Sequence, residues 1–407
     1  MDSLSRREFC TGALMAAGMA ASMGAQAAEK KGTPDIAGFD ETDAGELKKD
    51  AWKPVSDRKI KVGIVGYGVC KFGAQFGFQN HPNVEVVAAS DLFPDRCAEL
   101  AKIVAAKKTY PSCEEMFEKD KEIEAVFIAT DAPSHARLVI AGLKRGLHIC
   151  SAVPAVFGDD QLELADEMLA TVKKTGLTYA LFETSAYHAD CYAMHQIYKA
   201  GGFGKLIYSE GEYHHYCKPG TAIASYKEWR KGLPPQWYPT HGNAYYTCVS
   251  GGSFTSVSCL GIPSLDPLRQ PENNAYKNPF GTEVALMRTS EGGMSRMLKS
   301  GDIPGAHGER GRVYGQKGSF ESNASYKGVA DISKVDQKKP QLPPGMPAGG
   351  HGGSHGYLAD DFIASILLQR KPRVDVACAL NTTVAGIISH QSAMKDGETL
   401  TIPQYAL

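Results

Sequence analysis

The chain of 407 residues lacks an excess of either charge, and it lacks a long hydrophobic run beyond its first residues. Its 44 Lys and Arg balance 45 Asp and Glu, which leaves a net charge of −1 and no basic run. Nucleic acids and anionic membranes attract proteins through dense positive charge, so neither partner is expected. Crossing a bilayer takes about 18 or more apolar residues, and no later stretch supplies them, so we expect no stable membrane span.

CxxC pairs are also absent, although the sequence holds 10 cysteines. Cys10 belongs to an N-terminal leader, and most of the others stand among apolar residues, as in "LHICSAV" and "TSVSCLG". This placement is typical of buried, small hydrophobic side chains. After export, one or two disulfides would be open to them, but the spacing assigns no pairing.

The leader itself is the most specific sorting signal. Arg6 and Arg7 precede a weakly apolar run rich in Ala, Met and Gly, and a cleavage site follows Ala27. This pattern predicts a twin-arginine signal peptide over residues 1–27 and a periplasmic or otherwise exported protein. The alternative is an N-terminal helix or membrane anchor, for which the run is short and glycine-rich. Because the twin-arginine route moves folded proteins, a nicotinamide cofactor would have to travel with the protein and be regenerated on it.

The next two segments differ in their charge and in their pattern of apolar residues. Residues 28–57 are charged and poor in branched apolar residues, which predicts a linker or loosely docked arm. Residues 58–180 then alternate apolar strands with helix-length segments such as 95–107 and 134–146. The strands are "KIKVGIVGYG", "VEVVAASD", "AVFIAT" and "LHICSAVP". Continuous apolar strands separated by helices predict an α/β Rossmann domain with a doubly wound parallel sheet.

From residue 181 to 407 the pattern changes again. "KLIYSEGEYHHY", "GTEVALMRTS" and "GGMSRMLKS" alternate apolar and polar residues, as strands with one exposed face do. We therefore expect a C-terminal α+β domain with a largely antiparallel open sheet and few helices. A Pro/Gly-rich loop near 340–356 interrupts it, and "YLADDFIASILLQ" and "VACALNTTVAGIISHQSAMK" predict two closing helices.

The motif "VGIVGYGVCKFG" indicates a dinucleotide site. Gly66 allows a tight turn after the strand, and Gly68 lets the backbone approach a pyrophosphate. The third fingerprint position is Lys71, so looser packing of helix on strand is expected. Asp91 closes the next strand, where a carboxylate accepts from the ribose 2′-hydroxyl and favours NAD over NADP. The alternative is an α/β domain whose glycine turn and strand-end acid bind no cofactor.

The third strand ends at Thr130, and a helix opens just after it. The carboxyl edge of a parallel sheet is where a dinucleotide lies, so this segment should face the nicotinamide. His135 alone is more often a helix-start residue than a ligand. The expected cofactor-binding residues are Gly66, Gly68, Val69, Cys70, Asp91, Thr130, Pro133, His135 and Pro154.

These motifs, together with "ASDLFPDR", "GLHICSAVPA" and "GFGKLIYSEGEY", resemble the glucose–fructose oxidoreductase/inositol dehydrogenase/MocA (Gfo/Idh/MocA) family over nearly the whole mature chain. Ordinary dehydrogenases of that family carry Glu-Lys-Pro after the fourth strand, and the lysine acts on the substrate hydroxyl. Here Val153 stands in place of the lysine, and Pro154 is kept. Valine exchanges no proton, so the usual acid–base group is missing.

Within the family, the sequence resembles most the NAD-dependent glycosidases typified by bacterial α-N-acetylgalactosaminidases. The shared elements are a Val-Pro step, a Glu-x-x-x-Tyr element (Glu183, Tyr187) and Tyr-Pro-Thr-His-Gly at 238–242. That branch continues with Leu-Gly-Pro, whereas this chain continues with "NAYYTCVSGGSF", so the resemblance does not name the sugar.

The resemblance implies an enzyme that transiently oxidises the C3 hydroxyl of a sugar with bound NAD⁺. The C2 proton then leaves, the C1 aglycone is eliminated, water adds, and the same cofactor returns the hydride. Such chemistry needs one group at O3 and another at C2. His241 is expected at the hydroxyl, and Tyr238 or Tyr187 at C2, with a phenol pKa lowered by NAD⁺ and by neighbouring groups.

Sugar contacts are expected from aromatic and charged side chains, namely Glu183, Glu212, Trp229 and Arg230. The partner is then a small carbohydrate or glycan, and relatives of this kind favour a homo-oligomer. A net sugar dehydrogenase or sugar–sugar oxidoreductase and a catalytically silent sugar-binding relative are the alternatives. In the last case Tyr238, Tyr245 and Tyr246 would be core or interface aromatics, and His241 a satisfied buried histidine.

Two histidine clusters invite a metal hypothesis. His214, His215 and Cys217 alternate along a predicted strand, so neighbours face opposite sides of the sheet. His351 and His355 stand in the Pro/Gly-rich loop. Neither cluster shows a third ligand on the same side, so no metal site is expected.

Overall fold

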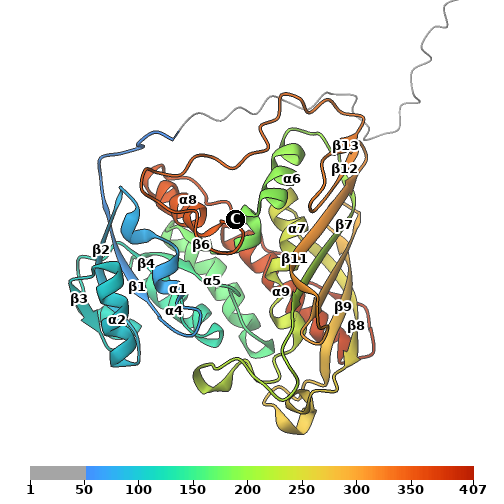
Figure 1. Ribbon diagram of the computed structural model, residues 1–407, viewed down its shortest axis with the longest axis horizontal. Helices are drawn as coiled ribbons and strands as arrows, with labels where there is room; N and C mark the ends of the chain where they lie inside the picture. Colours follow the sequence, from blue (N-terminus) through green and yellow to red (C-terminus); the bar gives the residue numbers. More distant parts are fainter. Residues whose placement is uncertain (1–51) are drawn as a thin grey trace, which may run out of the picture. The chain divides into compact units, whose positions relative to one another are not determined.

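The computed structural model describes residues 52–407 (Figure 1). The predicted signal peptide at 1–27 and most of the predicted arm at 28–57 therefore lie outside the described residues. The first sheet has six strands, all parallel, in the order β3-β2-β1-β4-β5-β6. The strands are β1 (Ile60–Val65), β2 (Val84–Ser90), β3 (Lys108–Tyr110), β4 (Ala125–Ile128), β5 (His148–Ser151) and β6 (Tyr179–Leu181).

This sheet is the Rossmann sheet that the apolar runs predict. Every residue of β4 is buried, as expected for a strand covered on both faces. The strand order reverses between β1 and β4, because the chain runs outward through β2 and β3 and then returns. Ligands of doubly wound sheets bind in the crevice at that reversal, beyond the carboxyl ends of the strands.

The second sheet has eight strands in the order β13-β12-β11-β7-β10-β9-β8-β14. Only β7 and β10 pair in parallel; the other neighbours are antiparallel. The strands are β7 (Leu206–His215), β8 (Phe254–Pro263), β9 (Phe280–Thr289), β10 (Met294–Ser300), β11 (His307–Gly315), β12 (Gly318–Glu321), β13 (Lys327–Gly328) and β14 (Leu400–Thr401). The prediction of a largely antiparallel sheet is confirmed.

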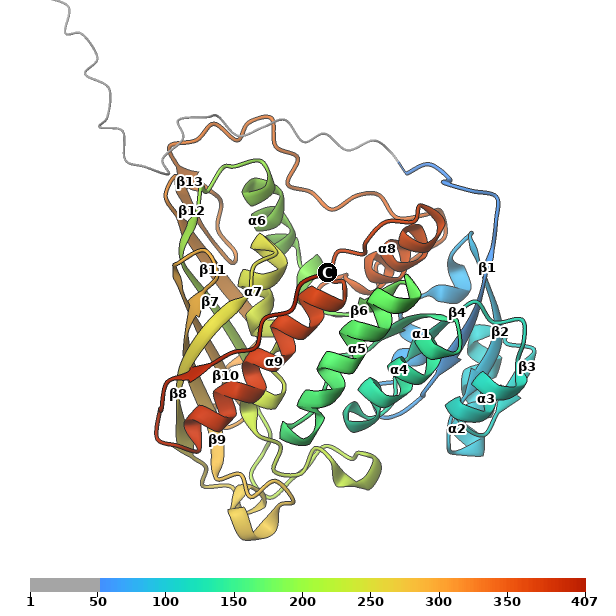
Figure 2. The ribbon, with the colours of Figure 1, turned by 180° about the vertical axis from the view of Figure 1, so that it is seen from behind.

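Nine α-helices lie within residues 52–407. They are α1 (Phe72–Gln75), α2 (Pro94–Val104), α3 (Cys113–Lys119), α4 (His135–Lys144), α5 (Leu162–Thr175), α6 (Ala189–Lys199), α7 (Thr240–Ser250), α8 (His355–Leu367) and α9 (Val376–Ala393). The two closing helices are confirmed as α8 and α9. Helices α6, α7 and α9 lie along one face of the second sheet (Figure 2).

Helix α7 was not expected, because its sequence shows no amphipathic period. Residues 240–249 are all buried, so no polar stripe marks a solvent face. It lies tight against β7: a Cβ added at Gly211 would overlap the carbonyl of Gly242. This close approach holds the start of α7, and with it His241, against the sheet.

Helix α8 packs against the first sheet rather than the second. Phe362 contacts the rings of Phe78 and Phe182, with ring centroids 6.4 and 6.3 Å apart. The chain therefore returns across the boundary that we predicted at residue 180. Phe78 and Phe182 also pack on Phe127 of β4, so this aromatic cluster joins α8 to the Rossmann sheet.

A buried contact between a carboxylate and an imidazole ties the helical layer to the second sheet. Glu283 on β9 lies 2.6 Å from Nδ1 of His390 on α9, and its other oxygen accepts the Gln236 N–H at 2.7 Å. We expect Glu283→Ala to lower the free energy of unfolding by about 3–5 kcal/mol, because it leaves a buried partner unpaired. Chemical denaturation would measure this loss.

The exposed pair of Glu115 and Lys119 offers the control. Glu115→Ala should change the free energy of unfolding by less than about 0.5 kcal/mol. Equal losses in the two variants would contradict the importance of the buried pair.

Candidate active site

A cavity of about 800 Å³ lies beyond the ends of β1 and β4, at the reversal of strand order. Gly66 and Gly68 line it. Gly66 has φ +98°, and a Cβ there would overlap the carbonyl of Ala129. A Cβ at Gly68 would meet no atom within 4 Å, so this part of the loop borders open space. Both glycines have the geometry that a dinucleotide loop requires.

The carboxylate of Asp91 also lines this cavity. Its Oδ2 accepts the backbone N–H of Tyr67 at 2.7 Å, and its Oδ1 accepts that of Phe93 at 2.9 Å. Each carboxylate oxygen has two lone pairs, so acceptor capacity remains for a ribose hydroxyl. Asp91 thus fixes the glycine loop and stands where NAD specificity is set.

The packing behind the loop differs from our expectation. Helix α1 is a single turn, and Lys71 precedes it with φ +50°. A Cβ at Gly73 would overlap the carbonyl of Gly66, so strand and helix meet closely at that glycine. The looser packing predicted from Lys71 is wrong, because Gly73, two residues later, allows the close contact that a glycine at position 71 would allow.

Val69, Cys70, Thr130 and His135 line the cavity as well. Ala152 and Val153, directly after β5, do so too, so the place of the family's lysine is an apolar wall.

Pro133 and Pro154 lie outside the lining. The carbonyl of Pro154 lies 2.9 Å from Nδ1 of His135, and that of Pro133 accepts the Gln161 amide at 2.8 Å. Both prolines therefore support the wall through their carbonyl groups.

The cavity fits a dinucleotide. Its volume is within the range of about 300–1,000 Å³ typical of ligand sites. Open space at Gly68 and the acid at Asp91 are the two features that a pyrophosphate and an adenine ribose need.

We expect Asp91→Ser to lower NAD affinity about 10- to 100-fold, because hydrogen bonds to charged groups contribute about 1.5–3 kcal/mol. Titration of the cofactor-free protein with NAD would measure this. Glu99, a half-exposed carboxylate that lines the same cavity, provides the control. Glu99→Ala should bind NAD as the unchanged protein does. Unchanged affinity in Asp91→Ser would exclude the assigned role.

His241 and Glu183, 58 residues apart in the chain, meet in the interior. Nδ1 of His241, the second residue of α7, lies 2.8 Å from Oε1 of Glu183. The two side chains are 5% and 0% exposed. Glu183 follows β6 and also accepts the Ser185 N–H at 2.9 Å, so its carboxylate is held in place.

The two groups stabilise each other's charge. Burial disfavours both charged forms, but the imidazole, the Thr240 hydroxyl and the Ser185 amide hold the pKa of Glu183 below its usual value. Burial likewise opposes protonation of His241, but the Glu183 carboxylate raises the pKa of the imidazole. With Nδ1 bound to Glu183, Nε2 is the nitrogen that can exchange a proton with a substrate.

Two tyrosines flank the imidazole. The ring centroid of His241 is 4.8 Å from that of Tyr213 and 5.6 Å from that of Tyr238. Tyr238 also lines the cofactor cavity, whereas His241 and Glu183 lie outside its lining, so Tyr238 links the cavity to the His241–Glu183 pair. Burial raises the pKa of Tyr238, and the Arg230 guanidinium opposes that rise. The phenol therefore remains protonated near neutral pH.

Tyr187 lies elsewhere. It ends the short 3-10 helix η4 (Thr184–Tyr187), and its ring stacks on Tyr192 and Tyr357, each centroid 5.7 Å away. Burial raises the pKa of Tyr187 well above the ordinary value. The structure does not bring it to the cavity lining with Tyr238.

Of the expected sugar contacts, Trp229 and Arg230 line the cavity. The Arg230 guanidinium lies 4.2 Å from the Trp229 ring centroid and 5.7 Å from that of Tyr238. Glu212 pairs instead with Arg296 at 2.6 Å. Successive residues of a strand face opposite sides, so Tyr213 beside His241 directs Glu212 to the far face of the sheet.

The sequence analysis missed Tyr213 and Lys299. They are direct neighbours across β7 and β10, and the Lys299 ammonium lies 4.5 Å from the Tyr213 ring centroid. The alternation of residues along β7 and β10 could have placed Tyr213 and Lys299 on one face of the sheet. To assign that face to the site, one must also know that it meets α7.

Within residues 52–407, no three His, Cys, Asp or Glu side chains lie close enough together to hold a metal ion. Nδ1 of His351 lies 2.9 Å from Nε2 of His355, and both rings pack on Phe72 without a further ligand. All nine cysteines of this part are free, and Cys248 and Cys378 have sulfur atoms 4.0 Å apart. Over the same residues, none of the helices combines the length and apolar character that a bilayer span needs.

Comparisons with solved structures agree with this fold. A scyllo-inositol dehydrogenase from Lactobacillus casei superposes with a TM-score of 0.65 at 17% identity, over 85% of this chain and 99% of that one. A levoglucosan dehydrogenase in complex with NADH and levoglucosan gives 0.67 at 16% identity, over 85% and 100%. At such identities the similarity concerns the fold.

Curated relatives are proteins named for glycosyl hydrolase family 109. Protein 1 of Bacteroides fragilis is 29% identical over 164 residues, 38% of this chain and 35% of its own. Protein 3 of Phocaeicola vulgatus is 26% identical over 291 residues, 64% and 52% of the two chains. The alignments thus span about a third to a half of these relatives' lengths.

The family comparison matches residues 60–182 to the oxidoreductase family with an NAD-binding Rossmann fold (GFO_IDH_MocA). That stretch runs from the first residue of β1 to just past β6 and contains the glycine loop and Asp91. Residues 60–182 thus carry the NAD-binding Rossmann domain of the Gfo/Idh/MocA oxidoreductase family, and the chain is similar beyond them to glycosyl hydrolase family 109 proteins.

Proposed function

We propose that the protein is an NAD-dependent, carbohydrate-active enzyme that cleaves a glycoside by transient oxidation at C3, elimination, hydration and reduction. The observation that carries this proposal is the buried His241–Glu183 pair with Tyr238 at the cofactor cavity, beside a strand end where valine replaces the family's lysine. The names of the curated relatives support it.

Gly66, Gly68 and Asp91 are the residues that would hold NAD. When bound, NAD⁺ supplies the hydride acceptor for a sugar carbon. Val153 excludes proton exchange at the usual place, so the protons must move through other groups, His241 on α7 and Tyr238 just before it.

His241 takes the proton of the substrate hydroxyl at Nε2. The Glu183 carboxylate at Nδ1 fixes the tautomer and stabilises the imidazolium that forms, as the carboxylate of a catalytic triad does. Glu183 raises the pKa of His241. Below this raised pKa the resting imidazole is already protonated and cannot accept the proton of the substrate hydroxyl. The rate should therefore fall on the acid side.

Tyr238 is the base that removes the proton at C2. As a base it must first lose its own proton, which burial opposes. Arg230 beside it works in the opposite direction, and the positive charge of an oxidised nicotinamide would add to that effect.

Export fits the same scheme. The predicted twin-arginine signal would carry the folded protein, with NAD enclosed, to the periplasm. A cofactor restored in each cycle needs no supply there. We also propose a homo-oligomer, which sedimentation of the purified protein would test.

The protein purified without added cofactor provides the test. It should contain NAD, cleave a member of a glycoside panel, and in D₂O release a sugar with deuterium at C2. Cleavage without deuterium at C2 would refute the elimination route.

One observation favours a second function. A buried Tyr238 that keeps its proton is a weak base, yet His241 alone suffices for oxidation of a hydroxyl. This favours a net sugar dehydrogenase or sugar–sugar oxidoreductase, which would yield an oxidised sugar and no released aglycone.

A further inference from the structure

A second, small cavity of about 70 Å³ adjoins the site just described. Arg230 and Tyr238 line both cavities, and Tyr213 and Lys299 line only this one. On the same measure a water molecule needs about 10–15 Å³, so the space suits a group of a few heavy atoms.

Lys299 is the most unusual residue of this cavity. Its side chain is 8% exposed, and Nζ donates to the Ser300 carbonyl at 3.3 Å. Among the described residues, no carboxylate lies within ion-pair distance of its ammonium. A buried ammonium without an anion is strongly disfavoured, because the lost hydration is not replaced.

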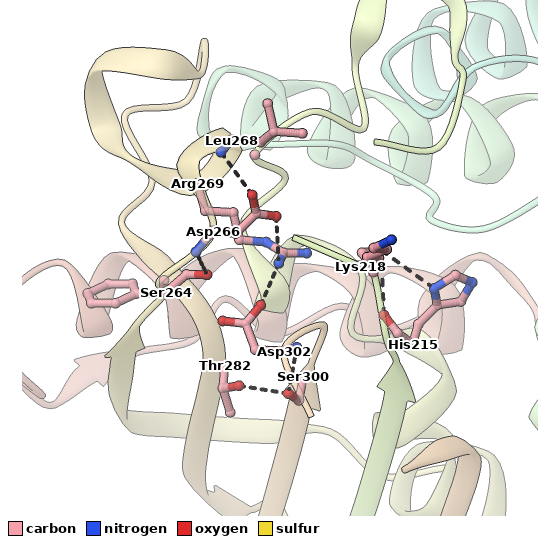
Figure 3. A network of polar contacts seen from close by, with 12 residues as sticks. His215, Lys218, Ser264, Asp266, Leu268, Arg269, Thr282, Ser300 and Asp302 are labelled. Atoms are coloured by element: carbon pink, nitrogen blue, oxygen red, sulfur yellow. Dashed lines mark hydrogen bonds and ion pairs between the residues drawn. The ribbon is translucent and has the colours of Figure 1, made fainter. Parts of the chain in front are cut away.

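The acids nearest to Lys299 are engaged elsewhere. Asp266 and Asp302 both bind Arg269, as Figure 3 shows. Glu283 stands opposite Lys299 across β9 and β10, but its oxygens bind His390 and Gln236.

Arg230, the second cation of the cavity, has no ion pair with a carboxylate among residues 52–407 either. Its guanidinium rests on Trp229 and Tyr238. Arg269 and Asp266 also line the cavity but pair with each other, so Lys299 and Arg230 remain as two cations without a carboxylate partner.

We infer that this cavity binds a carboxylate substituent of the substrate, so that the sugar processed beside Tyr238 is an acidic sugar of the hexuronate type. The inference rests on the proposed function for the position of the sugar. Lys299 and Arg230 would provide the charge and hydrogen-bond donors, and Tyr213 and Tyr238 the walls.

The protonation of Lys299 should follow the ligand. Burial, together with the charges of Arg269 and Arg230, lowers the pKa of Lys299 to about 7, whereas the Cys217 thiol and Asp302 act in the opposite direction. The other titratable groups lining the cavity are Tyr213, His215, Tyr238 and Asp266. A bound carboxylate favours the ammonium, so affinity should fall as the pH rises from about 7 to 9.

Calorimetric titration can test this without turnover. The NAD-loaded protein is titrated with glucuronate and galacturonate, with glucose and galactose as neutral counterparts, and with glucose 6-phosphate. We expect at least one acid to bind ten-fold or more tightly than its neutral sugar, and that preference to vanish in Lys299→Met. The exposed Lys218 nearby is the control, and Lys218→Met should keep the preference.

Stability separates lost binding from lost folding. Because the pKa of Lys299 is lowered to about 7, the folded protein below about pH 7 buries a charged ammonium, which lowers the free energy of unfolding. This loss of stability shrinks as the pH rises from about 7 toward 10.5, the ordinary pKa of lysine, because the folded protein then holds the neutral amine. Lys299→Met should therefore melt at a higher temperature than the unchanged protein near pH 7, while it loses the acid.

Three results would overturn the inference. They are neutral sugars that bind as tightly as the acids, no binding of either acid, and a preference for the acid that persists in Lys299→Met. Binding of the 6-phosphate as tight as that of the acids would overturn the carboxylate assignment. An acid preference without deuterium at C2 would instead refute only the proposed reaction.

Discussion

His241→Asn is expected to reduce turnover about 10²- to 10⁴-fold, the usual contribution of a general acid–base group. Asparagine can still donate to Glu183 from the position of Nδ1, so the buried carboxylate keeps a partner. It has no equivalent of Nε2 and cannot take the substrate proton. Steady-state kinetics on the cleaved glycoside, with NAD content measured alongside, would show the loss.

The same variant tests the pH dependence. In the unchanged protein the rate should fall as the pH drops through the raised pKa of His241, because the protonated imidazole cannot accept a proton. That limb should disappear in His241→Asn. His148, a half-buried histidine on β5 outside the cavity lining, gives the control: His148→Asn should keep both rate and pH profile. A full rate in His241→Asn would refute its role.

Tyr238→Phe should separate the two halves of the reaction. Phenylalanine keeps the packing against Tyr213 and His241 but cannot move the C2 proton. We expect oxidation of the sugar to continue, so that reduced nicotinamide accumulates on the protein, and release of the aglycone to fall about 10²-fold or more. Absorbance of the bound cofactor and release of the aglycone would be followed in the same sample.

The neighbouring tyrosine supplies the matched control. Tyr213→Phe removes a hydroxyl next to the same imidazole, and it should leave aglycone release within about 10-fold of the unchanged protein. Unchanged release in Tyr238→Phe, or equal losses in both variants, would assign the C2 proton to another group.

The Rossmann part could be predicted from the sequence because its signals are local. Buried strands such as β4 are apolar throughout, and Gly66 and Asp91 stand at fixed points relative to the strand ends. The packing of Gly73 under Gly66 could not be predicted, because it depends on α1 being a single turn that starts after Lys71.

The second sheet was predictable in type but not in detail. Alternation identified β7, β9 and β10 as strands, but which strands pair, and that β7 and β10 run in parallel, depends on tertiary contacts. Helix α7 has no exposed face and hence no helical period, so it was missed although it carries His241.

The site shows the same limit. The motifs around Glu183 and His241 indicated chemistry, but their contact joins residues 58 positions apart and needed the fold. Glu212 was selected for its charge and lies on the wrong face, whereas Tyr213, one residue later, meets the imidazole. Lys299 gave no sequence signal, because a lysine near a strand end is ordinarily exposed.

The central claim is that the cofactor stays on the protein and is restored in every cycle. The most direct measurement is rapid mixing of the purified protein, without added NAD, with a cleavable glycoside while nicotinamide absorbance is recorded. The account predicts that reduced cofactor appears before the aglycone is released, then disappears, and never exceeds the amount of protein. Turnover that requires added NAD and leaves one reduced cofactor for each product molecule would contradict it.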